Sequence, residues 1–467
     1  MKIRPGFFGL CSTLLLALCL AACSDGSDNT PGTAPQPEYK PIVFVHGQFG
    51  SAQQFETQAM RFTSNDYPQE LLFAFEYDTN SDENPLSDLD LFIDEVLAAT
   101  GADRVYAIGH SRGTSVWTGY LEDEAFAGPD KVAKYVNIDG RSPEALPGGV
   151  PTIGIWGEWN SADSGYNRRE DNSDAQIGPN PEDNYHFPAK SHSEVASSAE
   201  AFAIMYEFLT GLPPATTAVV PVDGAVTVAG RAIIFPENVG FEGTTVEIWD
   251  IDPSTGQRTS DAPRDSFRIG SSGSFGPVEL TSGSYYEFAL LRDASDSFPV
   301  PSVHHFYGEP FDHDDYFLRL QASRPGESLE AFIPRAEDAT GFVVTRMREF
   351  WGDQGAMSDE LFVDGLNVLT PAISPRASSP GSGVNLAVFL FDEGSDKVTD
   401  LEKGEIFPFN AITFLTGADV FTPAAFSGTG TVEFSLVTRG GGETRLNVPN
   451  WPSWDNRISV MFRDDRE

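Results

Sequence analysis

Cysteine is nearly absent from this chain. Only three of its 467 residues are cysteines, Cys11, Cys19 and Cys23, and all three lie near the N-terminus. The long segment that follows them carries no thiol. This excludes a disulfide framework there, and it also excludes a cysteine-based metal site and a cysteine nucleophile.

Basic residues are also scarce. The sequence has 30 lysines and arginines against 69 aspartates and glutamates, which gives a formal net charge of −39 at pH 7. A charge of this sign and size repels phosphate backbones and bare anionic membranes. We therefore expect no nucleic-acid partner.

Long apolar runs are missing after the first 22 residues. In that first segment the basic Lys2 and Arg4 precede an apolar run over residues 7–20. The run is shorter than the roughly 20 residues that a membrane-spanning helix needs. The pattern predicts a secretory signal, with an uncleaved anchor as the alternative.

The signal ends in Leu-Ala-Ala-Cys, which resembles the lipobox of bacterial lipoproteins. The resemblance implies removal of residues 1–22, diacylation of Cys23 and a lipid-anchored protein in the cell envelope. Ser24 after that cysteine implies the outer membrane. An ordinary cleaved signal and a secreted protein is the alternative. Loss of the two cations Lys2 and Arg4 would change the net charge from −39 to −41.

Composition divides the rest of the chain into three parts. Residues 23–40 are rich in Pro, Gly, Ser and Asp, which predicts a flexible tether. Residues 41–212 alternate apolar strand patterns with amphipathic helix patterns, including a single helix over 194–209, and predict a mostly parallel sheet flanked by helices. Residues 213–467 are short alternating runs between turn residues, which predicts an all-β sandwich or barrel, with two modules divided near residue 334 as an alternative.

One pentapeptide carries the strongest chemical signal. Residues 109–113 read Gly-His-Ser-Arg-Gly, after an apolar β-branched run and before a helical pattern. Strand, sharp turn and helix in this order is the context of a G-x-S-x-G nucleophile elbow. Glycine at both flanks removes side-chain atoms that would collide at so tight a turn. We predict Ser111 as the nucleophile.

The oxyanion formed during acyl transfer needs two backbone N–H donors. One should belong to the residue after the nucleophile, Arg112. The other should come from the loop after the first strand, which reads His46-Gly47-Gln48, and Gln48 is the candidate. His46 is then expected to support this loop.

A serine nucleophile needs an imidazole base and a carboxylate that orients it. His192 and His186 follow Ser111 in this part of the chain; His192 is favoured because it lies on a loop before the last helix pattern, whereas His186 lies within a predicted strand. The acid candidates are Asp139, Asp163 and Glu158, all after predicted strand ends. Asp139 is preferred, because Gly140 after it permits a sharp turn.

The histidines and aspartates in Ser302–Phe317 match no standard ligand spacing. We expect no metal and no cofactor.

These residues together resemble a known family. The chain resembles the α/β-hydrolase lipases that carry a C-terminal β-barrel domain, a group with a member from a hyperthermophilic archaeon. The resemblance lies in His46-Gly47, the Gly-His-Ser-Arg-Gly turn, the segment 136–140, and Ser191-His192 followed by 201–209. The resemblance implies an α/β-hydrolase fold, and a β region that helps engage acyl chains. It also favours Asp139, since in that family the acid follows the strand after the elbow unit. Arg112 departs from the family, where this position can be apolar.

The sequence therefore predicts a lipid-anchored serine carboxylester hydrolase, a lipase or esterase that acts on acyl lipids. A polyester, thioester or amide hydrolase using the same site is one alternative. A non-catalytic binding lipoprotein on a retired hydrolase fold is the other.

Overall fold

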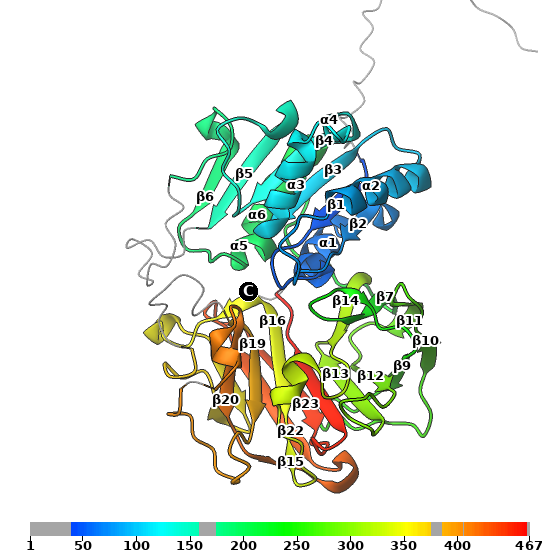
Figure 1. The fold of residues 1–467 in the computed structure, drawn as a ribbon, viewed down its shortest axis with the longest axis vertical. Helices are drawn as coiled ribbons and strands as arrows, with labels where there is room; N and C mark the ends of the chain where they lie inside the picture. Colours follow the sequence, from blue (N-terminus) through cyan, green and yellow to red (C-terminus); the bar gives the residue numbers. More distant parts are fainter. Residues whose placement is uncertain (1–38, 158–173, 375–384, 405, 465–467) are drawn as a thin grey trace, which may run out of the picture. The chain divides into compact units, whose positions relative to one another are not determined.

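Six parallel strands form the central sheet of the N-terminal part of the protein (Figure 1). The computed structural model describes residues 39–157, 174–374, 385–404 and 406–464. The sheet order is β2-β1-β3-β4-β5-β6. Its strands are β1 (Ile42–Val45), β2 (Leu72–Phe75), β3 (Val105–His110), β4 (Val132–Ile138), β5 (Thr152–Gly157) and β6 (Asn184–Phe187).

Helices cover both faces of this sheet. On one face pack α1 (Glu56–Thr63), α5 (Glu194–Ser197) and α6 (Ala199–Thr210), and on the other α2 (Leu86–Thr100) and α3 (Arg112–Glu122); α4 (Gly128–Lys131) is a single turn before β4. Strands such as β3 are buried along their whole length, because side chains on both faces meet helices. The predicted α/β-hydrolase architecture, a parallel sheet between two helical layers, is confirmed.

The last predicted helix differs from expectation, because the structure divides it in two. Ser198 adopts an extended conformation (φ −72°, ψ 151°), and its hydroxyl accepts a hydrogen bond from the N–H of Ala201. A serine at this position satisfies a free N–H group at the start of α6, which favours a new helix over a continuous one. The prediction of one uninterrupted helix was therefore wrong.

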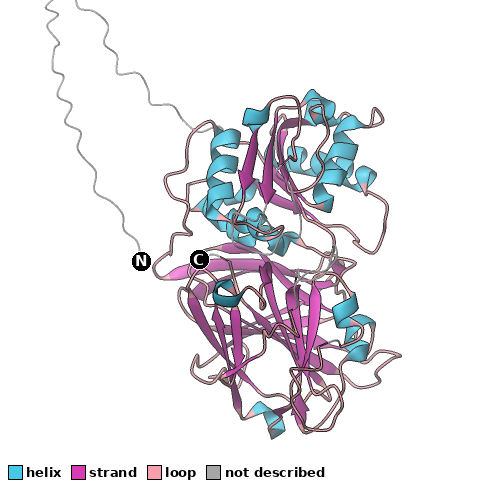
Figure 2. Ribbon diagram, turned by 90° about the vertical axis from the view of Figure 1, so that its left-hand side faces the viewer, coloured by secondary structure: helices cyan, strands magenta, loops and turns pink. Residues whose placement is uncertain are grey.

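From residue 225 onward the protein is built of strands, with only short 3-10 turns between them in the described part (Figure 2). An eight-stranded sheet has the order β10-β9-β12-β13-β24-β16-β19-β20. Its strands are β9 (Thr245–Asp250), β10 (Asp265–Arg268), β12 (Tyr286–Arg292), β13 (Ser302–Gly308), β16 (Phe342–Phe350), β19 (Asn385–Phe391), β20 (Leu415–Asp419) and β24 (Asn456–Met461).

Two four-stranded sheets pack on the eight-stranded one, and together they form the β region. One contains β7 (Ala225–Ile234), β8 (Val239–Gly240), β11 (Ser274–Thr281) and β14 (Asp315–Ala322). The other contains β17 (Glu360–Val363), β18 (Leu366–Asn367), β22 (Thr431–Val437) and β23 (Glu443–Pro449), and a separate pair joins β15 (Ala339–Thr340) to β21 (Thr422–Pro423). The all-β expectation is confirmed. Strands from both sides of residue 334 share the large sheet, since β13 pairs with β24.

The β region contacts the α/β part, residues 39–212, through buried side chains. Phe317 of β14 packs edge-on against Phe44 of β1, with ring centroids 5.8 Å apart. Glu76, just after β2, pairs with Arg231 of β7 and, at 2.9 Å, with Arg319 of β14. These two guanidinium groups lower the pKa of the Glu76 carboxyl to about 2, although burial alone would raise it.

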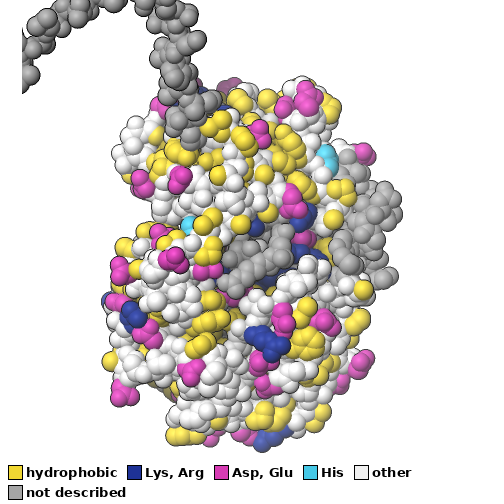
Figure 3. All heavy atoms as spheres, turned by 180° about the vertical axis from the view of Figure 1, so that it is seen from behind, with side chains coloured by type: hydrophobic (Ala, Val, Ile, Leu, Met, Phe, Trp, Pro, Cys, Tyr) yellow, Lys and Arg dark blue, Asp and Glu magenta, His cyan; other side chains and the backbone are white. Residues whose placement is uncertain are grey.

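Acidic side chains are spread over the face drawn in Figure 3, with few lysines or arginines among them. In the described part of the chain, no helix combines the length and the apolar character that crossing a membrane requires. The predicted signal, Cys23 and the predicted tether up to residue 38 lie outside the described residues.

Candidate active site

Ser111 occupies a strained turn between β3 and α3. Its φ of 53° and ψ of −121° lie in a region that residues other than glycine rarely adopt. A Cβ at Gly109 would lie 2.9 Å from the Gly113 carbonyl oxygen, and one at Gly113 would collide with the carbonyl of Val45. The strand-turn-helix context and the need for both glycines are thus as the sequence predicted.

Asp139 and His192 are held together at the ends of neighbouring elements. His192 Nδ1 lies 2.6 Å from Asp139 Oδ2, and Asp139 Oδ1 accepts a hydrogen bond of 2.9 Å from the N–H of Gly157. Asp139 follows β4 with a φ of 46°, a left-handed conformation that aspartate tolerates. A carboxylate at Nδ1 favours the tautomer whose unprotonated Nε2 is available for proton transfer.

The alternative histidine, His186, is not brought to this place. His186 lies on the edge strand β6 beside the ring of Trp156, with ring centroids 6.5 Å apart. Asp163 and Glu158, the other acids considered, lie outside the described residues. Among the described carboxylates, Asp139 is the one bonded to the His192 ring.

His110 supports the His192 loop from the elbow side. Its ring lies 4.6 Å from that of His192, and its Nε2 donates a hydrogen bond of 2.8 Å to the His192 carbonyl. Burial, together with the neighbouring His192, holds the pKa of His110 well below 6.5, so this ring is neutral at pH 7. This role was not predictable from the sequence, because position two of the elbow accepts many residues.

Glu349 and Glu194 hold the same loop from the side of the β region. The Glu349 carboxylate, at the end of β16, accepts hydrogen bonds from the Ser191 hydroxyl and, at 2.7 Å, from the N–H of Ser193. Both neighbours of His192 are therefore bonded to one buried carboxylate from a distant strand. We call Glu349 with these two bonds the loop clamp.

Glu194 reinforces the clamp through ion pairs. It pairs at 2.8 Å with Arg348 of β16 and at 2.8 Å with Arg439. Burial would raise the pKa of Glu194, but Arg439, Arg348 and Lys190 lower it to about 2. Sequence reasoning missed the clamp and these pairs, since their members lie more than a hundred residues apart.

The predicted oxyanion residues lie on either side of Ser111. Arg112 is the first residue of α3, so its N–H has no partner within the helix. The Arg112 guanidinium donates to Gln48 Oε1 at 2.6 Å and to the Glu83 carbonyl at 3.0 Å, and it lies 5.2 Å from the centre of the Tyr77 ring. The Arg112 side chain thus links the loop that contains Gln48 to the turn at Ser111 through a hydrogen bond.

His46 supports this loop without a charge. Its ring stacks on Tyr77 with centroids 4.5 Å apart. Burial lowers the pKa of His46 to about 4, so it is neutral at pH 7. Gly47 beside it is equally constrained, because a Cβ there would lie 3.0 Å from the Cβ of Ser111.

A cavity of about 320 Å³, the outer cavity, opens at these residues. Ser111, His192 and Gln48 line one side of it. The β region contributes a largely apolar part of the wall: Phe235, Pro236, Leu329, Met347, Leu386, Ala387, Ile412, Phe414 and Leu415. The cavity thus combines convergent polar groups with an apolar chamber, as binding sites for apolar ligands do.

The histidines of the acidic segment have other partners. His305 bonds Glu287 and Asn456, and His313 lies 2.7 Å from the Thr63 hydroxyl. Among the residues that the structure describes, no three such side chains are placed to hold a metal ion.

The fold and the elbow define an α/β hydrolase. Comparison with known families agrees: the model of class 2 lipases matches residues 39–121, that of the lipase C-terminal domain matches 224–325, and a further C-terminal domain model matches 328–466. The chain therefore has an α/β-hydrolase fold, with a segment that matches the class 2 lipases and a lipase C-terminal domain in its β region.

Solved structures are similar only in part. A gene product of Listeria innocua shares 15% identity and a TM-score of 0.30, covering 38% of this chain and 97% of its own. A Bacillus licheniformis lipase in its mature form shares 14% identity and a TM-score of 0.30, covering 38% of this chain and 94% of its own. Similarity at this level says nothing about substrate.

Proposed function

We propose that this hydrolase cleaves carboxylic esters of acyl lipids through a covalent acyl-enzyme at Ser111. The observation that carries the proposal is the Asp139–His192 hydrogen bond beside an elbow serine, at the mouth of an apolar cavity. A retired site would have no reason to retain the strained serine and the buried carboxylate together.

In the first half-reaction, Ser111 Oγ attacks the ester carbonyl carbon while His192 Nε2 takes the hydroxyl proton. The N–H groups of Gln48 and Arg112 stabilise the resulting oxyanion. The tetrahedral intermediate collapses, the ester C–O bond breaks, and the leaving alkoxide takes the proton from His192. Asp139 remains ionised and stabilises the imidazolium.

In the second half-reaction, water attacks the acyl-enzyme, with His192 again as the base. The fatty acid leaves and the Ser111 hydroxyl is restored. We further propose a lipid anchor at Cys23, which would place the enzyme in the cell envelope beside its substrates.

A fluorophosphonate probe tests the proposal. It should label the wild type, and Ser111→Ala should abolish labelling and lower kcat on p-nitrophenyl esters by about 10⁵-fold or more. Ser274→Ala, an exposed serine on β11, is the matched control and should behave as wild type. Labelling or hydrolysis that persists in a folded Ser111→Ala variant contradicts the assignment, and an unlabelled wild type favours a non-catalytic protein.

A further inference from the structure

A second cavity of about 120 Å³, the inner cavity, adjoins the outer one inside the β region. The two share several lining residues, among them Gln321, Thr345, Met347 and Leu415. The shared residues place the inner cavity next to the outer one, on the side of the β region.

The wall of the inner cavity is one face of the eight-stranded sheet. Cross-strand partners form successive rows on that face: Thr345 pairs with Met461 and Ala387, Val343 pairs with Ser459 and Phe389, and Arg457 pairs with His304. The alternate residues point the other way into the core against β17 and β22. The first two rows are mainly apolar, and the third is polar.

The polar row lies beyond the two apolar rows. Ser459 pairs with Val343, so Arg457 is level with Gly341, four residues before Thr345, which lines both cavities. At about 3.3 Å per residue this is roughly 13 Å. Met347 lines the outer cavity, whereas Arg457 lines only the inner one.

Positive charge exceeds negative charge at this end. Glu330 pairs with Arg292 at 2.5 Å and with Arg335 at 2.6 Å, and its distance to Arg457 Nε is 3.5 Å. One carboxylate thus faces three guanidinium groups, with Asp455 acting more weakly on Arg335.

Of the three arginines, Arg457 has the longest contact with Glu330, and it is the one that lines the inner cavity. Its side chain is 3% exposed, and its Nη2 has no hydrogen-bond partner among the described residues. Burial and the neighbouring Arg335 and Arg292 lower the pKa of Arg457 to about 9, with Glu330 opposing them. A buried guanidinium donor without an acceptor is costly, so an acceptor brought by a ligand would be strongly favoured.

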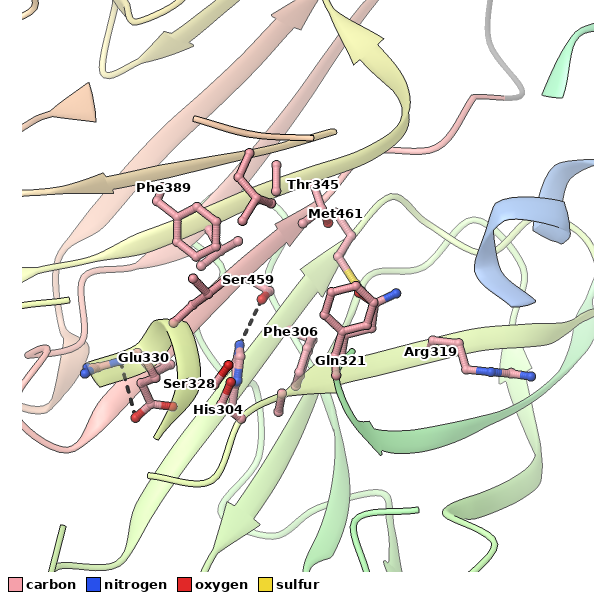
Figure 4. A pocket seen from close by; sticks show the side chains of 18 of the residues that line it. His304, Phe306, Arg319, Gln321, Ser328, Glu330, Thr345, Phe389, Ser459 and Met461 are labelled. Carbon is pink, nitrogen blue, oxygen red and sulfur yellow. Dashed lines mark hydrogen bonds and ion pairs between the residues drawn. The ribbon is translucent and has the colours of Figure 1, made fainter. Parts of the chain in front are cut away.

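His304 beside it adds a second polar group. Its Nε2 lies 2.8 Å from the Ser459 hydroxyl, and its Nδ1 has no partner within the described part of the chain. Figure 4 shows Glu330 and His304 on one side of the inner cavity and Gln321 and Arg319 on the other, with Phe306 between them. Arg319 shares the Glu76 carboxylate with Arg231, whereas at the other end of the cavity Arg457 has a guanidinium nitrogen without a hydrogen-bond partner among the described residues.

We propose that the inner cavity binds the far end of a long acyl chain that carries a carboxylate, so that the preferred substrates are half-esters of long dicarboxylic acids. The inference rests on ester cleavage at Ser111. The apolar rows accept the methylene groups, and the carboxylate pairs with Arg457 Nη2. A methyl end would leave that donor buried and unpaired.

The test compares p-nitrophenyl esters that end in methyl, hydroxyl or carboxylate, each in a series from butanoyl to octadecanoyl, at physiological salt. For short chains the end group should not matter. For long chains the carboxylate should raise kcat/KM over the methyl ester by about tenfold or more, which corresponds to 1.4 kcal/mol. Hydroxyl ends should fall between the two.

Arg457→Met should remove the preference while methyl-ended esters are still cleaved. Arg258→Met is the control, because it removes a partly buried guanidinium that pairs with Glu287 and lines neither cavity in the described structure; it should keep the preference. The wild-type series needs no variant, so a misfolded Arg457→Met does not spoil the test.

Three outcomes separate this inference from the proposed function. Cleavage at every length without an end-group preference overturns the inference and leaves ester hydrolysis standing. Hydroxyl ends that gain as much as carboxylate ends contradict the charge argument and so overturn it too. No cleavage of any ester is a failure of the proposed function itself.

Discussion

The loop clamp predicts that a strand of the β region controls the rate of chemistry at His192. Glu349 is fully buried, and it accepts hydrogen bonds from Ser191 and Ser193, the two neighbours of His192. Glu349→Gln keeps the size of the side chain. It replaces one accepting oxygen by an NH₂ group, which then faces a donor.

The expected effect on the fold is modest and that on kcat is large. Mispairing one buried donor costs about 1–3 kcal/mol, which a protein of this size tolerates. A displacement of the imidazole by about 1 Å, however, lowers kcat by about a hundredfold. KM should stay near its wild-type value, because Glu349 lies outside the lining of the outer cavity in the described structure.

Stopped-flow hydrolysis of p-nitrophenyl esters, with the fluorophosphonate labelling rate alongside, measures this effect. Both rates should fall together, and Glu349→Asp should restore part of each. Glu287→Gln is the control, since Glu287 is an equally buried carboxylate bonded to Arg258 and His305 away from the site. If Glu349→Gln lowers the Tm as the control does but leaves kcat within about twofold, the clamp does not position His192.

Three further predictions follow from the same contacts. Asp139→Asn should lower kcat by about 10⁴-fold in steady-state assays while the far-UV circular dichroism stays unchanged, and a small loss would refute its role. Gly113→Ala should lower the free energy of unfolding by about 1–3 kcal/mol in urea titrations, because its Cβ meets the Val45 carbonyl. Glu194 and Glu287 each have a pKa of about 2 in the folded protein, below the usual 4.5. The contribution of these ionised carboxylates to the free energy of unfolding is therefore present above pH 4.5 and is lost as the pH falls toward 2. Thermal melts should show this loss, with a shallower slope in Glu287→Gln.

Local sequence patterns predicted most of the α/β part, residues 39–212. Apolar runs gave the parallel strands, and the spacing of Gly109 and Gly113 gave the turn at Ser111, because both depend on nearby residues. The break at Ser198 was missed although serine is a common N-cap. Its signal was weaker than the apolar periodicity that continues through it.

The supports of His192 could not be predicted in this way. Glu349 is 156 residues from Ser193, and only the pairing of β16 within a sheet of the β region brings its carboxylate to the loop. The same holds for Arg457. Its place in the wall of the inner cavity depends on the pairing register of β13, β24 and β16, which the sequence does not reveal. The catalytic roles of Ser111, His192 and Asp139 remain proposals, although the hydrogen bond between the latter two agrees with the predicted pair.

The two halves of the protein depend on each other for stability as well as for chemistry. Removal of the β region would take Arg231, Arg319 and Phe317 away from the parallel sheet. Apolar surface that Phe317 now covers beside Phe44 would meet water, which costs about 2 kcal/mol. Glu76 would exchange its two guanidinium partners for water. The α/β part and the β region are therefore not independent units, because β14 of the β region contributes Phe317 to the core of the α/β part and Arg319 to its buried ion pair.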